Sequence, residues 1–247
     1  MKTLKIITLS LTLFTVCQSN TLPIKTKRVE NNKITIPTES KQLIMVITPN
    51  WNEKKGKLQR YERQKITWQK VGKEIDIILG RNGLGWGLGL HTVPKNAQYI
   101  KKEGDGKAPA GLFSLGNGFG YKNFEIDFPY HSYKRTDHCV DDSNSKFYNT
   151  IIDSKKVKKD YKSFEHMKLR NNLYKYGITV EHNPKNIAQS GSCIFIHIQN
   201  KKGTGTAGCT SMKEREMVKI LRWLKKEKKP LLLQLPQDEI SNITMKK

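Results

Sequence analysis

A histidine and a cysteine near the C-terminal end of the chain are the residues best suited to make and break bonds. His197 ends an alternating apolar run, and the turn Thr206-Ala-Gly208 precedes Cys209. A strand would hold His197 rigidly as a general base for attack by a Cys209 thiolate. Gly208 has no side chain, so we expect its N–H and that of Cys209 to point into an oxyanion site.

A helix predicted after the cysteine is the element expected to activate it. Ser211 and Glu214 have the spacing of a capping box, with Ser211 at the N-cap. An apolar stripe at helical spacing follows, formed by Met217, Ile220, Leu221 and Leu224. Cys209 would then lie beside the positive end of the helix dipole, which lowers the pKa of a thiol.

The strand before the turn is predicted to present two faces. Cys193, Phe195 and His197 share one face, and three isoleucines, Ile194, Ile196 and Ile198, share the other. We expect the isoleucines to be buried and to fix His197. The candidates for orienting the imidazole are Asp141, Asp142, His182, Asn183 and a backbone carbonyl. A carbonyl is favoured, because a histidine in a strand has several nearby.

The cysteine count is consistent with one reactive thiol. The chain has four cysteines, and loss of Cys17 with a signal peptide would leave three. An odd number in an oxidising compartment leaves one cysteine unpaired within the chain. Cys139 and Cys193 could form a disulfide, and our hypothesis is that Cys209 stays free.

The N-terminal residues are typical of a secretory signal. A short basic start is followed by an apolar run too short to span a bilayer. We therefore predict a signal peptide over 1–19, cleaved near Ser19, with lipidation of Cys17 as the alternative. The protein is expected to be exported to the periplasm, cell wall or envelope. Residues 20–40 are predicted to be a linker, 41–236 the catalytic domain and 237–247 a C-terminal tail.

The remaining pattern predicts a mainly β (α+β) domain. Compact or alternating apolar runs predict strands at 43–48, 57–63, 75–79, 178–182, 193–197 and 231–235. The middle third, 116–172, has no clear period and is expected to be an elaborated loop with short helices. Its histidines, cysteine and aspartates lack paired metal-ligand spacing, so we expect no metal and no cofactor.

The net charge of +23 comes from 45 Lys and Arg against 22 Asp and Glu. The excess is mostly lysine and is dispersed along the chain, whereas nucleic-acid readers concentrate arginine and aromatic residues. We therefore expect no nucleic-acid partner. A general affinity for anions remains, which would allow peripheral association with an anionic wall or membrane surface.

These motifs resemble the catalytic signature of the L,D-transpeptidase (YkuD-like) family. His197 matches the family's strand histidine, and Thr206-Ala-Gly208-Cys209 matches its Ser/Thr-x-Gly-Cys turn. The segment from Gly104 to Phe113 resembles its Thr-Pro-x-Gly-x-Phe segment. The likeness covers most of 43–236 in element order. It implies a β-sandwich or barrel with a helix after the catalytic cysteine.

The resemblance implies acyl transfer on peptidoglycan stem peptides. Cys209 would form a thioester, with transfer to an amine in a transpeptidase or to water in an L,D-carboxypeptidase. Thr206, Thr210 and Ser211 are candidates for substrate contacts. The chain departs from the family at Ala207, where His is common, and at Ser211, where Arg is common. The alternative function is a non-catalytic module that binds the cell wall or anions.

Overall fold

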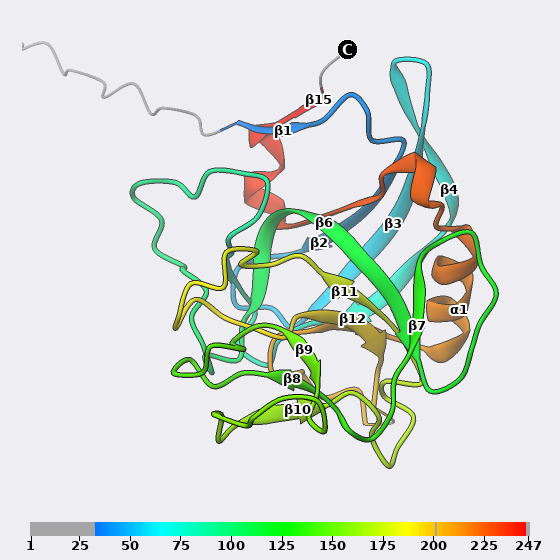
Figure 1. Cartoon of the computed structure of the whole chain (residues 1–247). Coiled ribbons are helices and arrows are strands. Elements are labelled where there is room, and N and C mark those ends of the chain that lie inside the picture. Colours follow the sequence, from blue (N-terminus) through cyan, green and yellow to red (C-terminus); the bar gives the residue numbers. More distant parts are fainter. Residues whose placement is uncertain (1–32, 201, 246–247) are drawn as a thin grey trace, which may run out of the picture. The chain divides into compact units, whose positions relative to one another are not determined.

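A closed β-barrel forms the centre of the protein. The computed structural model describes residues 33–245 with the exception of 201. The barrel strands are β2 (Gln42–Thr48), β3 (Lys55–Gln64), β4 (Thr67–Ile78), β6 (Ala108–Gly120), β11 (Tyr176–Val180), β12 (Phe195–Ile198), β13 (Thr210–Met212) and β14 (Leu231–Pro236). They are hydrogen-bonded in the order β11-β12-β13-β4-β3-β2-β14-β6, and pairing of β6 with β11 closes the circle (Figure 1). The expected mainly β fold is confirmed.

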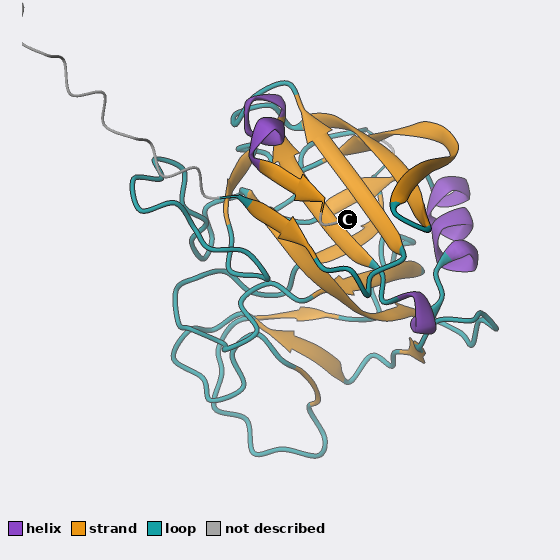
Figure 2. Cartoon of the chain, turned by 90° about the horizontal axis from the view of Figure 1, so that it is seen from above, coloured by secondary structure: helices purple, strands orange, loops and turns teal. Residues whose placement is uncertain are grey.

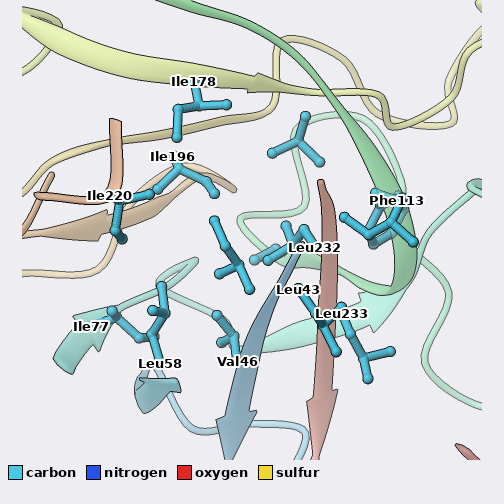
Figure 3. Packing of buried hydrophobic residues seen from close by; sticks show 14 of the residues in the cluster. Leu43, Val46, Leu58, Ile77, Phe113, Ile178, Ile196, Ile220, Leu232 and Leu233 are labelled. Atoms are coloured by element: carbon cyan, nitrogen blue, oxygen red, sulfur yellow. The ribbon is translucent and has the colours of Figure 1, made fainter. Parts of the chain in front are cut away.

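Apolar side chains from strands distant in sequence meet in one core. Figure 3 shows Leu43 and Val46 of β2 near Leu232 and Leu233 of β14, with Ile196 of β12 in the same cluster. β2 and β14 are parallel neighbours, with Leu43 opposite Leu231. A strand of this kind, buried on both faces, consists of a nearly continuous apolar run, as Leu231–Pro236 does.

The helix after the cysteine begins later than predicted. Thr210–Met212 forms β13, and α1 spans Glu214–Trp223 with Lys213 at its N-cap. Ser211 therefore does not cap the helix. Its hydroxyl instead donates to the carbonyl oxygen of Ile78 in β4, at 3.1 Å. Sheet pairing on both sides of β13 outweighed a local capping preference.

The apolar stripe of α1 is confirmed. Met217, Ile220 and Leu221 are buried in the helix, and Leu224 is buried at its C-cap. The helix packs against β11 and β12. In the view of Figure 2, turned by 90°, it lies at the side of the strands. A short 3-10 helix, η1 (Lys226–Lys228), follows before β14.

The folded domain is wider than the predicted 41–236. β1 (Ile34–Ile36) lies in the expected linker, and β15 (Ile243–Met245) lies in the expected tail. The two strands pair in parallel, and η2 (Gln237–Asn242) joins β14 to β15. Each strand is only three residues long and lies in a mostly polar segment, so no strand pattern was recognisable there. The predicted signal peptide, 1–19, lies outside the described residues.

The middle third contains strands where short helices were expected. β7 (Tyr130–Ser132) extends the barrel sheet beside β6. β8 (Asp137–Val140), β9 (Ile151–Asp153) and β10 (Phe164–His166) form a separate sheet in the order β10-β8-β9. No helix occurs between 116 and 172, all of which the structure describes. The strands are three or four residues long, so they show no recognisable alternation in the sequence.

Gly111 of β6 adopts a backbone conformation that only glycine takes up readily. β5 (Leu84–Trp86) pairs with the start of β6, and Gly111 of β6 has φ +133°. A Cβ on Gly111 would lie 1.9 Å from Cε1 of His91, whose Nδ1 accepts a hydrogen bond from the Leu112 N–H. Both the backbone conformation and the contact require glycine here.

We expect Gly111→Ala to lower the free energy of unfolding by about 2 to 3 kcal/mol, because it adds backbone strain and overpacking together. Urea denaturation would measure the change. Gly104→Ala is the matched control, because Gly104 also has positive φ (+69°) but its Cβ would meet nothing within 4 Å. Equal losses in the two variants would contradict the role of His91.

Candidate active site

The barrel brings His197 and Cys209 onto the same face of adjacent strands. β12 and β13 are parallel, with Ile196 opposite Thr210 and His197 opposite Ser211. Cys209 directly precedes β13, so it lies beside Phe195. The Phe195 N–H donates to the Cys209 Sγ at 3.3 Å. The sheet register therefore places Cys209 on the same face as His197, two residue pairs away along the two strands.

A small cavity joins the two side chains. Its volume is about 170 Å³. Its lining residues are Glu165, Leu169, Leu173, Tyr174, His197, Asn200, Thr204, Gly205, Thr206, Ala207, Cys209 and Ser211. Cys209, His197, Thr206 and Ser211 belong to the predicted site, and the cavity brings these four together. Gly208 and Thr210 do not line it.

The His197 ring is oriented by a backbone carbonyl, as expected. Nδ1 lies 2.8 Å from the carbonyl oxygen of Ile198. A carbonyl oxygen only accepts, so Nδ1 carries the proton of the neutral ring and Nε2 keeps its lone pair. Burial lowers the pKa of His197 to about 4, although this hydrogen bond opposes the shift. His197 is thus a neutral imidazole with a free basic nitrogen at neutral pH.

The expected lowering of the Cys209 pKa is wrong. Burial raises the pKa of the thiol, and the nearby charge of Glu165 raises it further. The Phe195 N–H and the charge of Lys101 oppose these effects only in part. The physical reason is the late start of α1 at Glu214, which removes the helix terminus from the cysteine. The thiol donates instead to the Cys193 carbonyl oxygen at 3.6 Å.

The turn before the cysteine is closed by Thr206. Its Oγ1 donates to the Cys209 carbonyl oxygen at 2.6 Å and accepts from the Gly208 N–H at 3.2 Å. Both groups lie within the turn, so Thr206 fixes the backbone that carries the nucleophile. The Gly208 N–H, predicted for an oxyanion site, already has this partner. A role for it in catalysis remains a prediction.

Thr210 faces away from the cavity. Its hydroxyl donates to Oε1 of Gln234 at 2.7 Å, and Nε2 of Gln234 donates to the Pro109 carbonyl oxygen at 2.9 Å. Thr210 and Gln234 are both buried. The prediction that Thr210 contacts substrate therefore disagrees with its position, because alternation along β13 directs it to the opposite face from Ser211.

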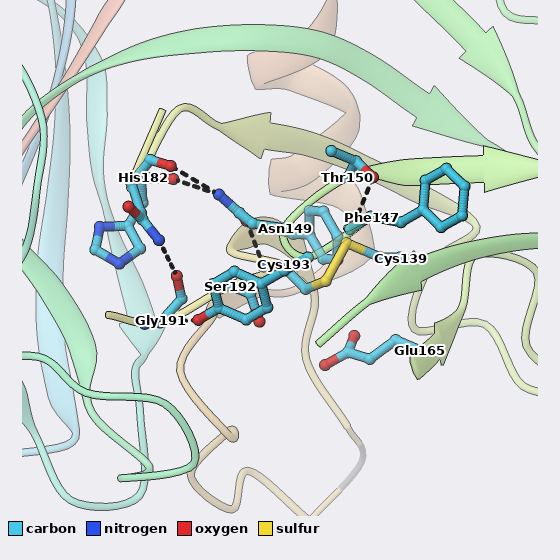
Figure 4. Close-up of a disulfide and its surroundings, with 12 residues drawn as sticks. Cys139, Phe147, Asn149, Thr150, Glu165, His182, Gly191, Ser192 and Cys193 are labelled. Carbon is cyan, nitrogen blue, oxygen red and sulfur yellow. Dashed lines mark hydrogen bonds between the residues drawn. A yellow bond between two sulfur atoms is a disulfide. The ribbon is translucent and has the colours of Figure 1, made fainter. Parts of the chain in front are cut away.

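The disulfide that Cys139 and Cys193 could form is present, and so is the free thiol hypothesised at Cys209. Cys139 and Cys193 are bonded, and Cys209 is a buried free cysteine. Figure 4 shows the disulfide with Asn149, whose Oδ1 accepts from the Cys193 N–H at 3.0 Å. The bond connects β8 to the segment that enters β12. It therefore links the three-stranded sheet β10-β8-β9, called the small sheet below, to the strand that carries His197.

Glu165 and Tyr174 line the cavity but were not predicted. The Tyr174 hydroxyl donates to Oε2 of Glu165 at 2.5 Å, and its ring lies edge-on to His197 at 5.1 Å between centroids. Glu165 is opposite Cys139 in the pairing of β10 with β8. The only signal in the sequence was indirect: a strand paired with Cys139 would approach Cys193 once the disulfide formed.

The described residues give no support for a metal site or a membrane-spanning helix. Among them, no group of three or more His, Cys, Asp and Glu side chains is arranged to hold a metal ion. In the same part of the chain, no helix is long and apolar enough to cross a bilayer. A larger cavity, of about 1200 Å³, is lined mainly by β3, β4 and α1 and contains no predicted catalytic residue.

We expect alkylation of Cys209 by iodoacetamide at pH 7 to be at least about tenfold slower in the native protein than in the denatured protein. Each unit by which the pKa is raised lowers the thiolate fraction about tenfold, and the thiolate is the reactive form. The native rate should rise with pH. Mass-spectrometric mapping of the modified peptide would measure both rates, and equal rates would show that the thiol is neither buried nor raised in pKa.

Comparisons with known proteins give a distant structural likeness. No family model matches the chain, and no curated protein matches it. The crystal structure of the helical cell shape determining protein Pgp2 from Campylobacter jejuni is similar over 83% of this chain, with 15% identity and a TM-score of 0.38. A lysine-to-alanine mutant of that protein is similar over 84% of this chain, with 14% identity and a TM-score of 0.40. The chain corresponds to 50% and 51% of those two chains, about half their length.

Proposed function

We propose that the protein is an exported cysteine acyltransferase that acts on peptidoglycan stem peptides. The observation that carries the proposal is the shared cavity of Cys209 and His197, in which the cysteine is free and the histidine presents a basic nitrogen. The substrate class rests on the resemblance of His197 and Thr206-Ala-Gly208-Cys209 to the L,D-transpeptidase signature. The proposed cellular location is the envelope. The net charge of +23 would allow peripheral association with an anionic wall or membrane surface there.

Proton transfer within the pair follows from the resting hydrogen bonds. The thiol proton is directed to the Cys193 carbonyl, so rotation about Cβ–Sγ must first turn it towards Nε2 of His197. His197 then accepts the proton as Sγ attacks the carbonyl carbon of the diamino acid at stem position three. The imidazolium returns this proton to the nitrogen of D-alanine when the peptide bond breaks. The product is a Cys209 thioester and free D-alanine.

The thioester is consumed by a second nucleophile. Water gives the shortened stem peptide, and an amine gives a new amide; in both cases His197 accepts the proton of the attacking group and returns it to Sγ. Because the pKa of His197 is about 4 and that of Cys209 is raised, the resting pair is imidazole and thiol. Deprotonation of the thiol therefore accompanies attack on bound substrate, and the free enzyme contains little thiolate.

The cavity admits only part of a stem peptide. Pockets that enclose a small ligand usually measure roughly 300 to 1,000 Å³, well above the volume found here. A cavity of this size fits one end group beside Cys209, and the rest of the peptide lies outside it, past Asn200 and Thr204 of the lining. This size suits an enzyme that binds one end group of a polymer-linked peptide at the reacting centre.

Incubation with purified tetrapeptide muropeptides, followed by mass spectrometry, tests the proposal. Release of D-alanine supports it. Dimer formation identifies a transpeptidase, and a monomeric tripeptide product identifies a carboxypeptidase. Absence of both products from the mature, disulfide-bonded protein would contradict the proposed function.

A non-catalytic wall-binding module is the second candidate. The burial of Cys209 and the positive net charge favour it, because a module needs charge and no reactive thiol. Cys209→Ala distinguishes the two functions. An enzyme loses turnover and keeps its binding to purified cell walls, whereas a module shows no turnover in either form and no change in binding.

A further inference from the structure

The cavity beside Cys209 is acidic in a strongly basic protein. Among the described residues that line it, Glu165 carries the one formal charge, and no lysine or arginine contributes. The chain as a whole has 45 Lys and Arg against 22 Asp and Glu. Burial, together with the nearby charges of Asp141 and Glu103, raises the pKa of the Glu165 carboxyl to about 7. When Glu165 is ionised, the cavity carries a charge opposite to that of the molecule, and a cation bound beside the carboxylate favours this ionised form.

Glu165 is held in place by three connections. β10 pairs with β8, where Glu165 lies opposite Cys139. The Cys139–Cys193 bond fixes β8 to the segment leading into β12, the strand that carries His197. The Tyr174 hydroxyl binds Oε2, and the Tyr174 ring packs on Phe195 and His197. These connections hold the Glu165 carboxylate at a fixed position in the lining of the cavity.

Orienting His197 is not the task of Glu165. Nδ1 of His197 already donates to the Ile198 carbonyl, and the described hydrogen bonds of the Glu165 side chain go to Tyr174 alone. One carboxylate oxygen is thus engaged, and Oε1 remains for a ligand. An anionic group placed near a thiol that must ionise is also unfavourable for catalysis unless a cation neutralises it.

We propose that Glu165, positioned by Tyr174, binds the ammonium group of the substrate beside Cys209 and so selects amine-bearing stem peptides. The inference rests on the proposed function and assigns its specificity to the small sheet of the middle third. The ligand class is a primary amine carried on a side group small enough for the cavity. When the ammonium pairs with the carboxylate, the charge that opposes ionisation of the thiol is cancelled.

Binding measurements in a Cys209→Ala background test the inference without chemistry. The probes are tetrapeptide muropeptides whose diamino acid has a free side-chain amine, and the same muropeptides acetylated at that amine. We expect the free amine to bind at least about tenfold more tightly, which corresponds to about 1.4 kcal/mol. Adding Glu165→Gln should abolish this preference, because the amide keeps the shape but not the charge. Adding Glu39→Gln removes one exposed carboxylate elsewhere and should preserve it.

Kinetics of the active protein separate binding from a structural or proton-relay role. Glu165→Gln should raise KM about tenfold for the free amine and leave KM for the acetylated form unchanged. Tyr174→Phe should give a smaller change in the same direction, and Glu165→Asp should restore part of the preference. A fall in kcat for both substrates with KM unchanged would indicate a proton relay and overturn the inference.

The outcomes also distinguish the inference from the proposed function. Equal affinity for the two muropeptides, or no binding of either, would overturn the inference even if D-alanine is released. A preference that depends on Glu165, without any D-alanine release by the wild-type protein, would support the inference and contradict the enzyme.

Discussion

Cys209→Ala is expected to lower the rate of D-alanine release from tetrapeptide muropeptides by at least about 10⁴-fold. Removal of a covalent nucleophile leaves only binding and the electrostatic environment to act on the substrate, and losses of this order or larger are typical. His197→Gln should lose about 10² to 10⁴-fold, because the base is absent but the thiol remains. Mass spectrometry of the released product measures both.

The two variants should not be additive. The proton that His197 accepts comes from Cys209, so the double variant is expected to be no slower than Cys209→Ala alone. Thermal unfolding serves as the control for folding. Cys209→Ala loses two weak hydrogen bonds, one from the Phe195 N–H and one to the Cys193 carbonyl oxygen, and its unfolding midpoint should stay close to that of the wild type. Retention of more than about 1% of the wild-type rate would remove Cys209 from the mechanism.

Removing the Cys139–Cys193 disulfide is expected to lower the free energy of unfolding by about 4 kcal/mol. The bond closes a loop across a sequence separation of 54 residues, and loop-closure entropy of the unfolded chain gives this magnitude. The double variant Cys139→Ala with Cys193→Ala is the correct test. A single variant would leave a thiol close to Cys209, where a new disulfide would obscure the result.

Urea denaturation at a fixed protein concentration measures this loss. Cys209→Ala is the matched control, since it removes a buried cysteine that closes no loop. The double variant should also lose the preference for amine-bearing substrate, because β8 and β10 are then free to move relative to the strand leading to His197. A loss below about 1 kcal/mol would show that packing alone fixes the small sheet.

Several features of the fold followed directly from residue patterns. Alternation in 193–198 divides the strand into an isoleucine face, which is buried in the barrel core, and a face with His197. The stripe from Met217 to Leu224 gives α1 its buried side. Loss of Cys17 with a signal peptide would leave three cysteines, which supported the hypothesis of a free Cys209 and allowed a bond between Cys139 and Cys193. Each of these depends on short-range periodicity or on counting.

The predictions that were wrong, the capping box and the loop in the middle third, share a different origin. The capping box at Ser211 and Glu214 is locally favourable, but Ser211 pairs with His197 on one side and Ile78 on the other. These partners are far away in sequence, so local preference could not reveal the competition. The strands of the middle third were missed for the same reason: each is stabilised by pairing and carries little pattern of its own.

The sequence by itself determined the mainly β class and singled out Cys209 and His197 as the predicted nucleophile and base, because strand patterns and residue spacing express these directly. The tertiary structure decided the environment of the thiol. Closure of the barrel turned 210–212 into a strand, moved the helix terminus away from Cys209 and directed Thr210 out of the site. Pairing of β10 with β8, anchored by the disulfide, brought Glu165 to the cavity. The pKa of a thiol depends on burial and on charges that the fold assembles, and its direction here is therefore a property of the folded barrel.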